Sequence, residues 1–341
     1  MPWPAIARRL GPGRILGLLV VLALIAAIGW ATVFWNTGGD RVSPTAPEVL
    51  VKVADGSSLA GVADNLQHLG IIRSALYLRL YADVSHSAGD IQAGVYLLSG
   101  RETTAEILKK LIAGDVATRK LTIPEGYTVS DIAFLMQAKG IASVSAFVAA
   151  ARSFPNPFVP QASPVRYRLE GYAFPSTYEI PYGTTPGQIA DMLFAQWERE
   201  FTPAMRQEAA KEHLTVNDVM TLASLVEREA KLESERPIIA AVFLNRLRIG
   251  MPMQSDPTVA YALGRPLDAV TIQDEHYASP YNTYYAKGLP PGPICNPGLP
   301  SIEAVLHPAK VGYLYFYGLP NGRHIFSYTY AQQLAAERAH P

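Results

Sequence analysis

The feature that most constrains this chain is an uncharged apolar run near its N-terminus, from Ile15 to Trp35. An α-helix of about 21 residues is long enough to cross the hydrocarbon core of a bilayer. Asp40 and Arg41 roughly cancel after the run, whereas three arginines precede it: Arg8, Arg9 and Arg14. Because basic flanks stay in the cytoplasm, we expect a cytoplasmic tail over residues 1–14, a membrane anchor over 15–35 and all later residues outside.

A cleaved signal peptide is the alternative interpretation of the same run. The run is longer than the apolar segment of a usual signal peptide, and no convincing small-x-small cleavage site precedes Asn36. Trp30 and Trp35 lie near the outer end, where aromatic residues often mark the membrane interface. We therefore favour a retained, single-pass anchor.

Charge and composition exclude several classes of function. The 29 basic and 29 acidic residues balance to a net charge of 0, so nucleic acid is not an expected partner. Cys295 is the single cysteine, which rules out an internal disulfide framework. The seven histidines form no His-Glu-x-x-His motif and no clustered pair, so no metal site is expected.

An internal repeat with an offset of about 70 residues follows a short linker over residues 36–48. Residues 51–70 align without gaps on residues 121–140, and the identical pairs are Gly56 with Gly126, Ala63 with Ala133, Gln67 with Gln137 and Gly70 with Gly140. Each copy predicts a short strand, an acidic-Gly turn, a hydroxyl-capped helix and a Gly stop. This resembles the strand-turn-helix of LysM modules, which bind N-acetylglucosamine-containing glycans. We expect a LysM-like module over residues 49–116, in either a glycan-binding or a purely architectural role.

The second half of the chain contains a helix that places a carboxylate among apolar residues. Thr215 and Asp218 form a capping-box pattern at its start. Apolar residues then recur at the spacing of one helical face through the segment Thr221-Leu-Ala-Ser-Leu-Val-Glu-Arg-Glu-Ala230. The pattern predicts one buried face.

The two glutamates of this segment are expected to differ. At about 100° per residue, Glu229 lies within about 20° of Leu222, while Glu227 points about 140° away. Glu227 is therefore predicted to be an ordinary solvated or ion-paired residue. Partial burial of Glu229 would raise its pKa and let it keep a proton near neutral pH, as a general acid requires.

A structural role for Glu229 is the competing interpretation. A buried glutamate can instead pair with an arginine, and the helix after Ser234 supplies Arg236, Arg246 and Arg248. Helical geometry alone leaves both interpretations open.

Loops rich in proline and glycine follow this helix pair, at residues 251–258 and 281–298. Prolines reduce loop entropy and suit a preorganised groove, and Tyr and Asn side chains suit sugar stacking and hydrogen bonding. Tyr281 and Asn282 are the best candidates for sugar contacts. Gln254 and Asp256 either line the cleft or hold the turn before Pro257.

Together these motifs resemble the endolytic murein transglycosylase (YceG-like) family, across nearly all of residues 49 to 335. They occur in the family's order and are Ala223-Ser-Leu-Val-Glu-Arg-Glu229, Ser234-Glu-Arg236, Val242-Phe-Leu-Asn-Arg-Leu-Arg-Ile-Gly-Met251, Gln254-Ser-Asp-Pro-Thr258, Tyr281-Asn-Thr-Tyr284, Gly288-Leu-Pro-Pro-Gly292 and His307-Pro-Ala-Lys310. The fold class that the resemblance implies is α+β: one transmembrane helix, a LysM-like module, and a lytic-transglycosylase-type catalytic domain over residues 117–335 that includes the second repeat at 121–140.

The resemblance implies cleavage of peptidoglycan within the glycan strand, at the β-1,4 bond from N-acetylmuramic acid to N-acetylglucosamine. Products would end in 1,6-anhydro-N-acetylmuramic acid, and no metal or organic cofactor would be needed. The family's catalytic glutamate falls on Glu229. The implied location is the cytoplasmic (inner) membrane with a periplasmic catalytic domain, and peptidoglycan synthases are candidate partners.

Two other functions compete with this interpretation. One is a muramidase that uses water and a second carboxylate, such as Glu170 or Asp256, and the other is a non-catalytic wall-binding scaffold. Structural roles are expected for Glu170, Glu179 and His324. Arg246 is expected either to orient a loop or to pair with Glu227.

Overall fold

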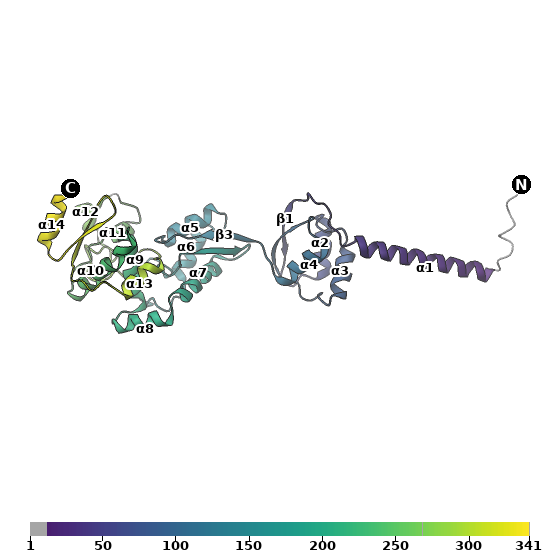
Figure 1. Ribbon diagram of the computed structural model, residues 1–341, viewed down its shortest axis with the longest axis horizontal. Coiled ribbons are helices and arrows are strands. Elements are labelled where there is room, and N and C mark those ends of the chain that lie inside the picture. Colours follow the sequence, from purple (N-terminus) through teal and green to yellow (C-terminus); the bar gives the residue numbers. More distant parts are fainter. Residues whose placement is uncertain (1–11, 268, 341) are drawn as a thin grey trace. The chain divides into compact units, whose positions relative to one another are not determined.

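The structure, a computed structural model, describes residues 12–267 and 269–340 of the chain (Figure 1). It contains two compact units. The first comprises the residues up to Thr118 together with Pro181–Gly183, and the second comprises Arg119–Ile180 and the residues from Thr184 onward. Both contain helices and strands, so the prediction of a mixed α+β protein is confirmed. Arg8 and Arg9 of the predicted cytoplasmic tail lie outside the described residues.

The apolar run forms a single helix, α1 (Pro12–Thr37). Its segment Ile15–Thr37 is long and apolar enough to cross a membrane, and none of its residues is buried. A helix over the predicted residues is therefore confirmed. Its insertion in a membrane and its topology remain predictions.

After α1, the first unit is a small strand–helix–helix–strand module closed by a third helix. The elements are β1 (Glu48–Val53), α2 (Leu59–His68), α3 (Ala75–Val84), β2 (Gly94–Ser99) and α4 (Thr104–Ala113). β1 and β2 pair antiparallel, in a register that joins Glu48 to Ser99 and Val53 to Gly94. The helices cover one face of this pair with a core that includes Leu66, Leu78, Tyr96 and Leu111.

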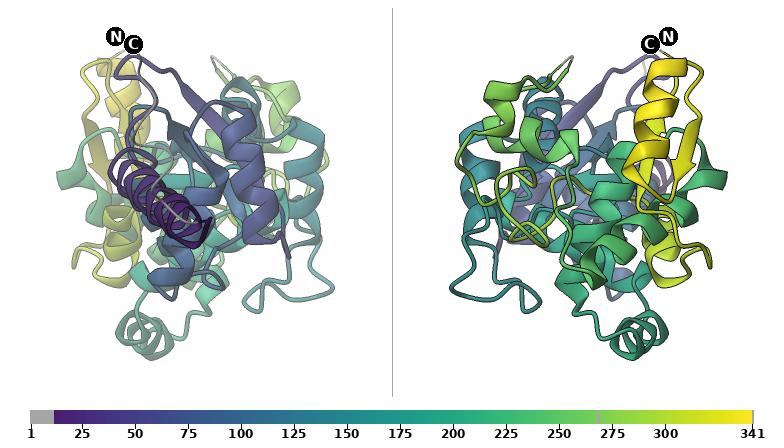
Figure 2. Two further views of the ribbon diagram at one scale, coloured as in Figure 1. Left: turned by 90° about the vertical axis from the view of Figure 1, so that its right-hand side faces the viewer. Right: turned by 90° about the vertical axis from the view of Figure 1, so that its left-hand side faces the viewer.

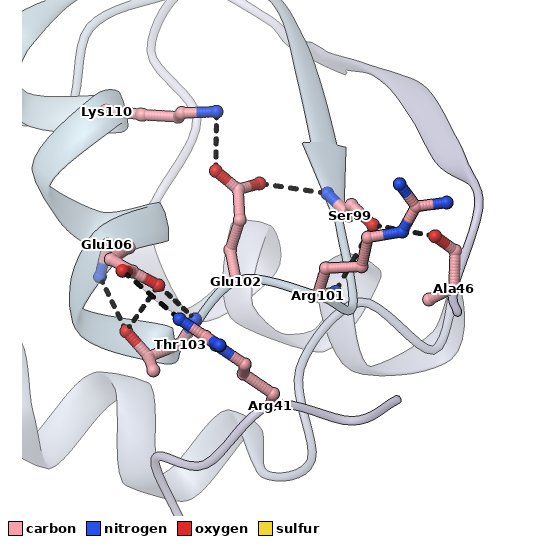
Figure 3. Close-up of polar contacts among 8 residues, drawn as sticks. All are labelled: Arg41, Ala46, Ser99, Arg101, Glu102, Thr103, Glu106 and Lys110. Atoms are coloured by element: carbon pink, nitrogen blue, oxygen red, sulfur yellow. Dashed lines mark hydrogen bonds and ion pairs between the residues drawn. The ribbon is translucent and has the colours of Figure 1, made fainter. Parts of the chain in front are cut away.

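The sequence predicts a helix that is capped by Thr103 or Thr104 and ends near Gly114, and α4 is present there with a cap at each end. Thr103 and Glu106 form a reciprocal capping box, and Gly114 ends α4 in the left-handed conformation at φ 67°. Figure 3 shows this cap, with Arg41 beside Glu106. Glu102 joins Lys110 of α4 to the backbone N–H of Ser99 at the end of β2.

The segment between α1 and β1 is fastened to this module along its length. The backbone N–H groups of Val42 and Ser43 both donate to the carbonyl oxygen of Gly100, at 2.9 and 3.1 Å. Ser99 Oγ donates to the carbonyl oxygen of Ala46 at 3.0 Å (Figure 3). The segment predicted as a linker therefore packs as part of the unit rather than as a free tether.

The internal repeat is confirmed as a repeat of local structure. The second copy has β3 (Thr118–Thr122), α5 (Val129–Ala138), α6 (Val144–Ser153) and β4 (Thr177–Pro181), and β3 pairs with β4. The helices α2 and α5 begin and end at positions 70 residues apart, Leu59–His68 and Val129–Ala138. Gln67 and Gln137 each accept a hydrogen bond from the first turn of the next helix.

The turn and stop glycines of both copies adopt the left-handed conformation. The φ angles are 73° and 75° at Gly56 and Gly126, and 69° and 65° at Gly70 and Gly140. The hydroxyl caps are Ser58 in the first copy and Thr128 in the second. Local signals along the chain thus predicted both copies correctly.

The rest of the second unit is mainly helical. Its elements are α7 (Pro186–Glu200), α8 (Pro203–Lys211), α9 (Val216–Glu229), the short 3₁₀ helix η1 (Glu233–Glu235), α10 (Arg236–Arg248), α11 (Asp256–Leu263), α12 (Ile272–Glu275) and α13 (Leu299–Leu306). α9 lies at the centre and contacts α8, α10, α11 and α13. An aromatic cluster around Trp197 and Tyr172 fills the space beside α7.

The chain ends in a hairpin and a helix: β5 (Tyr315–Gly318), β6 (His324–Ser327) and α14 (Tyr330–Ala339), which lie together in Figure 2. His324 Nδ1 lies 2.7 Å from Glu235 Oε2, and both side chains are buried, which supports the structural role expected for this histidine.

The three aromatic residues and two carboxylates of residues 169–179 predict a turn-containing strand pair, and this prediction is wrong. The segment from Leu169 to Phe174 is a turn, and only Thr177–Pro181 is a strand. Gly171 explains the turn, because its φ is 85° and a side chain there would overlap Pro293.

Candidate active site

The helix that carries the candidate acid is a central core helix. Thr215 caps α9 and forms the predicted capping box with Asp218. Every residue from Val219 to Val226 is buried, so the helix is covered on all sides and not on a single face. The side of the helix on which Glu227 or Glu229 lies therefore does not determine which of the two side chains is exposed to solvent.

Glu229 is the last residue of α9 and remains half-buried. Its Oε1 accepts a hydrogen bond of 2.6 Å from Ser255 Oγ. Burial raises the pKa of Glu229 to about 7, and nearby Asp256 adds to the rise, while the Ser255 hydroxyl, Arg228 and Arg246 oppose it. The negative end of the helix dipole disfavours the ionised form in the same direction. A carboxyl with this pKa can exchange a proton near neutral pH.

Ser255 is held in place by a small buried network of hydroxyl groups. Its backbone N–H donates to Thr283 Oγ1 at 3.0 Å, and its carbonyl oxygen accepts from Thr258 Oγ1 at 2.6 Å. The two threonine hydroxyls lie 2.8 Å apart. Ser255 Oγ is thereby left free to point at Glu229.

Arg246 of α10 fixes the loop that precedes Ser255. Its Nη1 donates to the carbonyl oxygens of Pro252 and Met253, at 3.2 and 2.6 Å, and its Nε donates to that of Leu314 at 2.6 Å. Of the two roles expected for Arg246, the structure supports loop orientation. Pairing with Glu227 is not seen, because Glu227 has another partner.

Gln254 and Asp256 flank Ser255 and are both exposed. Gln254 adopts φ 49°, a conformation that is uncommon for a residue with a side chain and that often occurs at functional sites. Asp256 Oδ1 accepts a hydrogen bond of 2.6 Å from Tyr284 Oη. Both side chains are therefore accessible next to the Ser255–Glu229 pair.

Glu227 is ion-paired, as one of its two expected roles required, but it is not solvated. Its Oε2 lies 2.9 Å from Arg236 Nη1, and the exposed fractions of the two side chains are 7% and 11%. The same oxygen accepts hydrogen bonds from Ser301 Oγ at 2.8 Å and from the backbone N–H of Gly298 at 3.0 Å. Arg236 thus pairs with Glu227, and no residue that the structure describes forms an ion pair with Glu229.

Tyr281 and Asn282, predicted to contact sugar, are enclosed in the protein, with exposed fractions of 4% and 0%. Asn282 Nδ2 donates to the carbonyl oxygens of Asp274, Glu275 and Tyr277, and its Oδ1 accepts from Tyr284 N–H. Tyr281 Oη accepts from the backbone N–H of Arg166. These contacts hold the loop that carries Thr283 and Tyr284 in place. Tyr281 and Asn282 therefore support the site without lining it.

The proline- and glycine-rich loop before α13 is also a core segment. Residues 292–298 are buried, so this part of the loop does not line a groove, contrary to the expectation. Asn296 in this loop donates to Glu170, whose carboxyl also accepts from the backbone N–H of Val129 and from Tyr261 Oη. Burial raises the pKa of Glu170 to about 8.

The fully occupied carboxyl of Glu170 supports the structural role expected for it. Its exposed fraction is 1%, and its three donors come from separate parts of the second unit. Glu179 lies in β4 and is exposed.

Sequence reasoning missed Ser255, Thr283 and Tyr284 as parts of the site. Ser255 stands between two predicted residues, but its bond to Glu229 joins positions 26 residues apart. No local pattern indicates such a contact. Within residues 12–267 and 269–340, no group of three or more His, Cys, Asp or Glu side chains could hold a metal ion.

Comparison with known proteins gives consistent matches. The model of the YceG-like family matches residues 51–339. An endolytic murein transglycosylase of Bacillus subtilis (strain 168) is 33% identical over 296 residues, which cover 82% of this chain and 81% of that protein. A second protein of that name, from Streptococcus pneumoniae serotype 2 (strain D39 / NCTC 7466), is 32% identical over 335 residues, and the match covers 89% of this chain and 60% of that relative.

A solved structure is similar as well. The crystal structure of a yceG-like protein from Listeria monocytogenes superposes with a TM-score of 0.60 and 33% sequence identity. The match covers 86% of this chain and 100% of that chain.

Proposed function

The chain belongs to the YceG-like family, and we infer that it is a lytic transglycosylase that cleaves peptidoglycan glycan strands. The relatives named endolytic murein transglycosylase support this activity. We propose further that cleavage takes place within the strand, at the β-1,4 bond from N-acetylmuramic acid to N-acetylglucosamine. The helix α1 would tether the enzyme to the membrane from which new strands emerge.

Glu229 is the proposed catalytic residue, and the observation that carries this role is that no described residue forms an ion pair with it. Glu227, two residues away, forms an ion pair with Arg236 and accepts hydrogen bonds from two further donors. Among the described residues, only the Ser255 hydroxyl donates a hydrogen bond to Glu229, and burial raises the pKa of Glu229 to about 7. It can therefore carry a proton to the reaction at neutral pH.

In the first step Glu229 gives its proton to the glycosidic oxygen, and the bond from that oxygen to C1 of the muramoyl residue breaks. The resulting carboxylate then takes the proton of the C6 hydroxyl of the same sugar, and O6 bonds to C1. No water is consumed, and the new end is 1,6-anhydro-N-acetylmuramic acid. One carboxyl serves both steps, unlike the paired carboxyls of most glycoside hydrolases.

Ser255 would keep the Glu229 carboxyl oriented toward the sugar, while Gln254 and Asp256 would contact the substrate. This assignment is supported by the exposure of both residues beside the Ser255–Glu229 bond. Tyr281 and Asn282 would position the loop rather than touch the sugar, in view of their burial.

A hydrolase that uses water is the second candidate function, and the position of Asp256 near Glu229 favours it. Asp256 is exposed, and its charge contributes to the raised pKa of Glu229, so the two carboxyls are close. A muramidase would need such a pair.

The end groups of the products test these alternatives. We would incubate the purified protein with peptidoglycan and analyse the fragments by mass spectrometry, with Glu229→Gln as the inactive variant. Glu233→Gln is the matched control, because Glu233 is an exposed glutamate just after α9. Anhydro ends that disappear in Glu229→Gln alone support the lytic reaction. Reducing ends would show hydrolysis, and intact strands that retain protein would indicate a binding scaffold.

A further inference from the structure

The helix α3 of the first unit carries an exposed apolar stripe. Leu76, Leu80 and Val84 are 49%, 38% and 68% exposed. They are spaced four residues apart, so at about 100° per residue they lie within about 80° of one another along one side of the helix. Three large apolar side chains in a row on a solvated helix usually mark a contact surface.

This stripe continues into the contact between α3 and the end of α1. Tyr77, next to the stripe around the helix, packs against Phe34 and Trp35 with ring centroids 5.7 and 5.4 Å apart. Tyr81, one turn later, stacks on Tyr77 at 6.0 Å. The aromatic residues of α3 that lie beside the stripe therefore contact the end of α1. Figure 1 shows α3 in the module that follows α1.

The joint between the two helices is tightly packed. A side chain at Gly38 or Gly39 would come within 2.6 Å of the Tyr77 ring, so both glycines lie directly on it. The backbone N–H of Thr104 in α4 donates to the carbonyl oxygen of Gly39 at 3.0 Å. Arg73, just before α3, donates from Nε to the carbonyl oxygen of Arg41 at 2.9 Å. These contacts hold α3 beside the end of α1.

Around the helix, the side of α3 next to Leu76 and away from Tyr77 carries charged residues that favour contact with water. Arg79 and Asp83 lie there, and Arg79 pairs with Asp64 of α2. An amphipathic helix with an apolar side, a charged side and aromatic residues at the boundary is typical of helices that lie in the membrane interface.

We propose that α3 docks on the outer surface of the membrane that α1 crosses, with Leu76, Leu80 and Val84 buried at the boundary of headgroups and acyl chains. The inference rests on the proposed anchoring by α1. Lipid is the occupant that the structure favours, because the stripe is continuous with the aromatic end of α1. The first module is then seated on the bilayer at a fixed height.

The test places a fluorescent label at single positions of the full-length chain in phospholipid nanodiscs. Cys295, the only native cysteine, is buried and is first replaced by alanine. An environment-sensitive fluorophore is then attached at Leu80→Cys or Val84→Cys. Leu97→Cys is the matched control, because Leu97 is an exposed leucine of the same module, on β2 and 40% exposed. Ile25→Cys, in the middle of α1, reports on the anchor itself.

Quenching by nitroxide-labelled lipid separates the outcomes. We expect severalfold stronger quenching at Leu80 and Val84 than at Leu97, and strong quenching by deeply placed nitroxide at Ile25. Quenching at Leu80 no greater than at Leu97, with Ile25 still quenched, overturns docking while the anchor stands. Shielding at Leu80 that depends on the number of protein copies per disc, and not on nitroxide lipid, would assign the stripe to a second copy and overturn the proposal.

Loss of quenching at Ile25 would instead reject the anchor, and the docking with it. Thermal unfolding of each labelled variant shows whether the label disturbs the module. Release of peptidoglycan fragments, measured on the same samples, reports the proposed enzymatic activity separately.

Discussion

Ser255 Oγ donates a hydrogen bond of 2.6 Å to Glu229 Oε1, and this bond joins the end of α9 to the loop before α11. A hydrogen bond to a carboxylate favours the ionised form. Ser255 therefore limits the rise in pKa that burial imposes on Glu229. The protonation of the proposed acid is set by a balance between its surroundings and one hydroxyl group.

The first prediction concerns the pH dependence of the reaction. Glu229 must be protonated to act as an acid, so kcat/KM should fall as the pH rises through about 7. Ser255→Ala removes a donor to the charged form, so the pKa rises further and this fall should move to higher pH. Rates of fragment release between about pH 5 and 9 measure both curves. Identical curves for the two proteins would contradict the role given to Ser255.

The second prediction is that Glu229→Gln makes the protein more stable in alkaline solution. The folded-state pKa lies above the unfolded value of 4.5, so the folded chain binds more protons between these values. The contribution of Glu229 to stability is complete below pH 4.5 and is lost as the pH rises through about 7. Replacement by neutral glutamine should therefore stabilise the protein by about 1 to 3 kcal/mol at about pH 8, after allowance for partial exposure.

Urea unfolding at about pH 5 and about pH 8 measures this effect. At the lower pH the gain should be below about 1 kcal/mol, because the carboxyl of the folded wild type is still protonated. An equal gain at both pH values would point to packing and not to ionisation. Glu233→Gln, on an exposed side chain, should show no gain at either pH.

The third prediction is that Glu227 contributes mainly to stability. Glu227→Ala removes the closer of the two acidic partners of the buried Arg236 guanidinium and leaves only Glu125, 4.0 Å away, so it should cost up to about 3 to 5 kcal/mol of unfolding free energy. Glu227→Gln keeps an oxygen for Ser301 and Gly298 and should cost less. A double-mutant cycle with Arg236→Met measures the pair, and additive effects would argue against the coupling.

The fourth prediction separates Glu170 from catalysis. Glu170→Gln can still accept from Val129 N–H and Asn296 through its oxygen and can donate to Tyr261 Oη, so activity should persist. Glu170→Ala leaves three buried donors without an acceptor and should cost about 2 to 4 kcal/mol. Loss of activity in a folded Glu170→Gln protein would instead identify a second catalytic carboxyl.

The fifth prediction concerns the positive φ angle of Gln254. Glycine removes the strain of φ 49°, so Gln254→Gly should stabilise the protein by about 0.5 to 1 kcal/mol, whereas Gln254→Ala should not. If the side chain contacts substrate, both variants should raise KM. An unchanged KM in both would limit Gln254 to a role in the turn.

Signals that act over a few residues made much of the fold predictable. The capping boxes at Thr103 and Thr215, and the left-handed glycines of the two repeats, each involve residues within about one turn. A helix after Thr103 or Thr104 and a helix after Thr215 were expected, and α4 and α9 are present.

The partners of the site residues could not be predicted in the same way. Glu227 is buried because Gly298 and Ser301, more than 70 residues later, reach its carboxylate. Asn282 has a side chain that suits sugar binding, but its Nδ2 donates hydrogen bonds to three backbone carbonyl oxygens just before it in the chain. Burial of this kind depends on tertiary packing, which spacing along the chain does not encode.

The turns of the two repeat copies differ in their surroundings. At Gly56 an added Cβ would meet nothing within 4 Å, so the turn of the first copy faces open space. At Gly126 the N–H group donates to the carbonyl oxygen of Asn296, and Glu227 and Arg228 lie close by. The second copy of the repeat thus contacts and supports the end of α9, the helix that carries Glu229. Both turns need glycine for their positive φ, but a substitution at Gly126 should also disturb the end of the acid-bearing helix, whereas one at Gly56 should affect only its own turn.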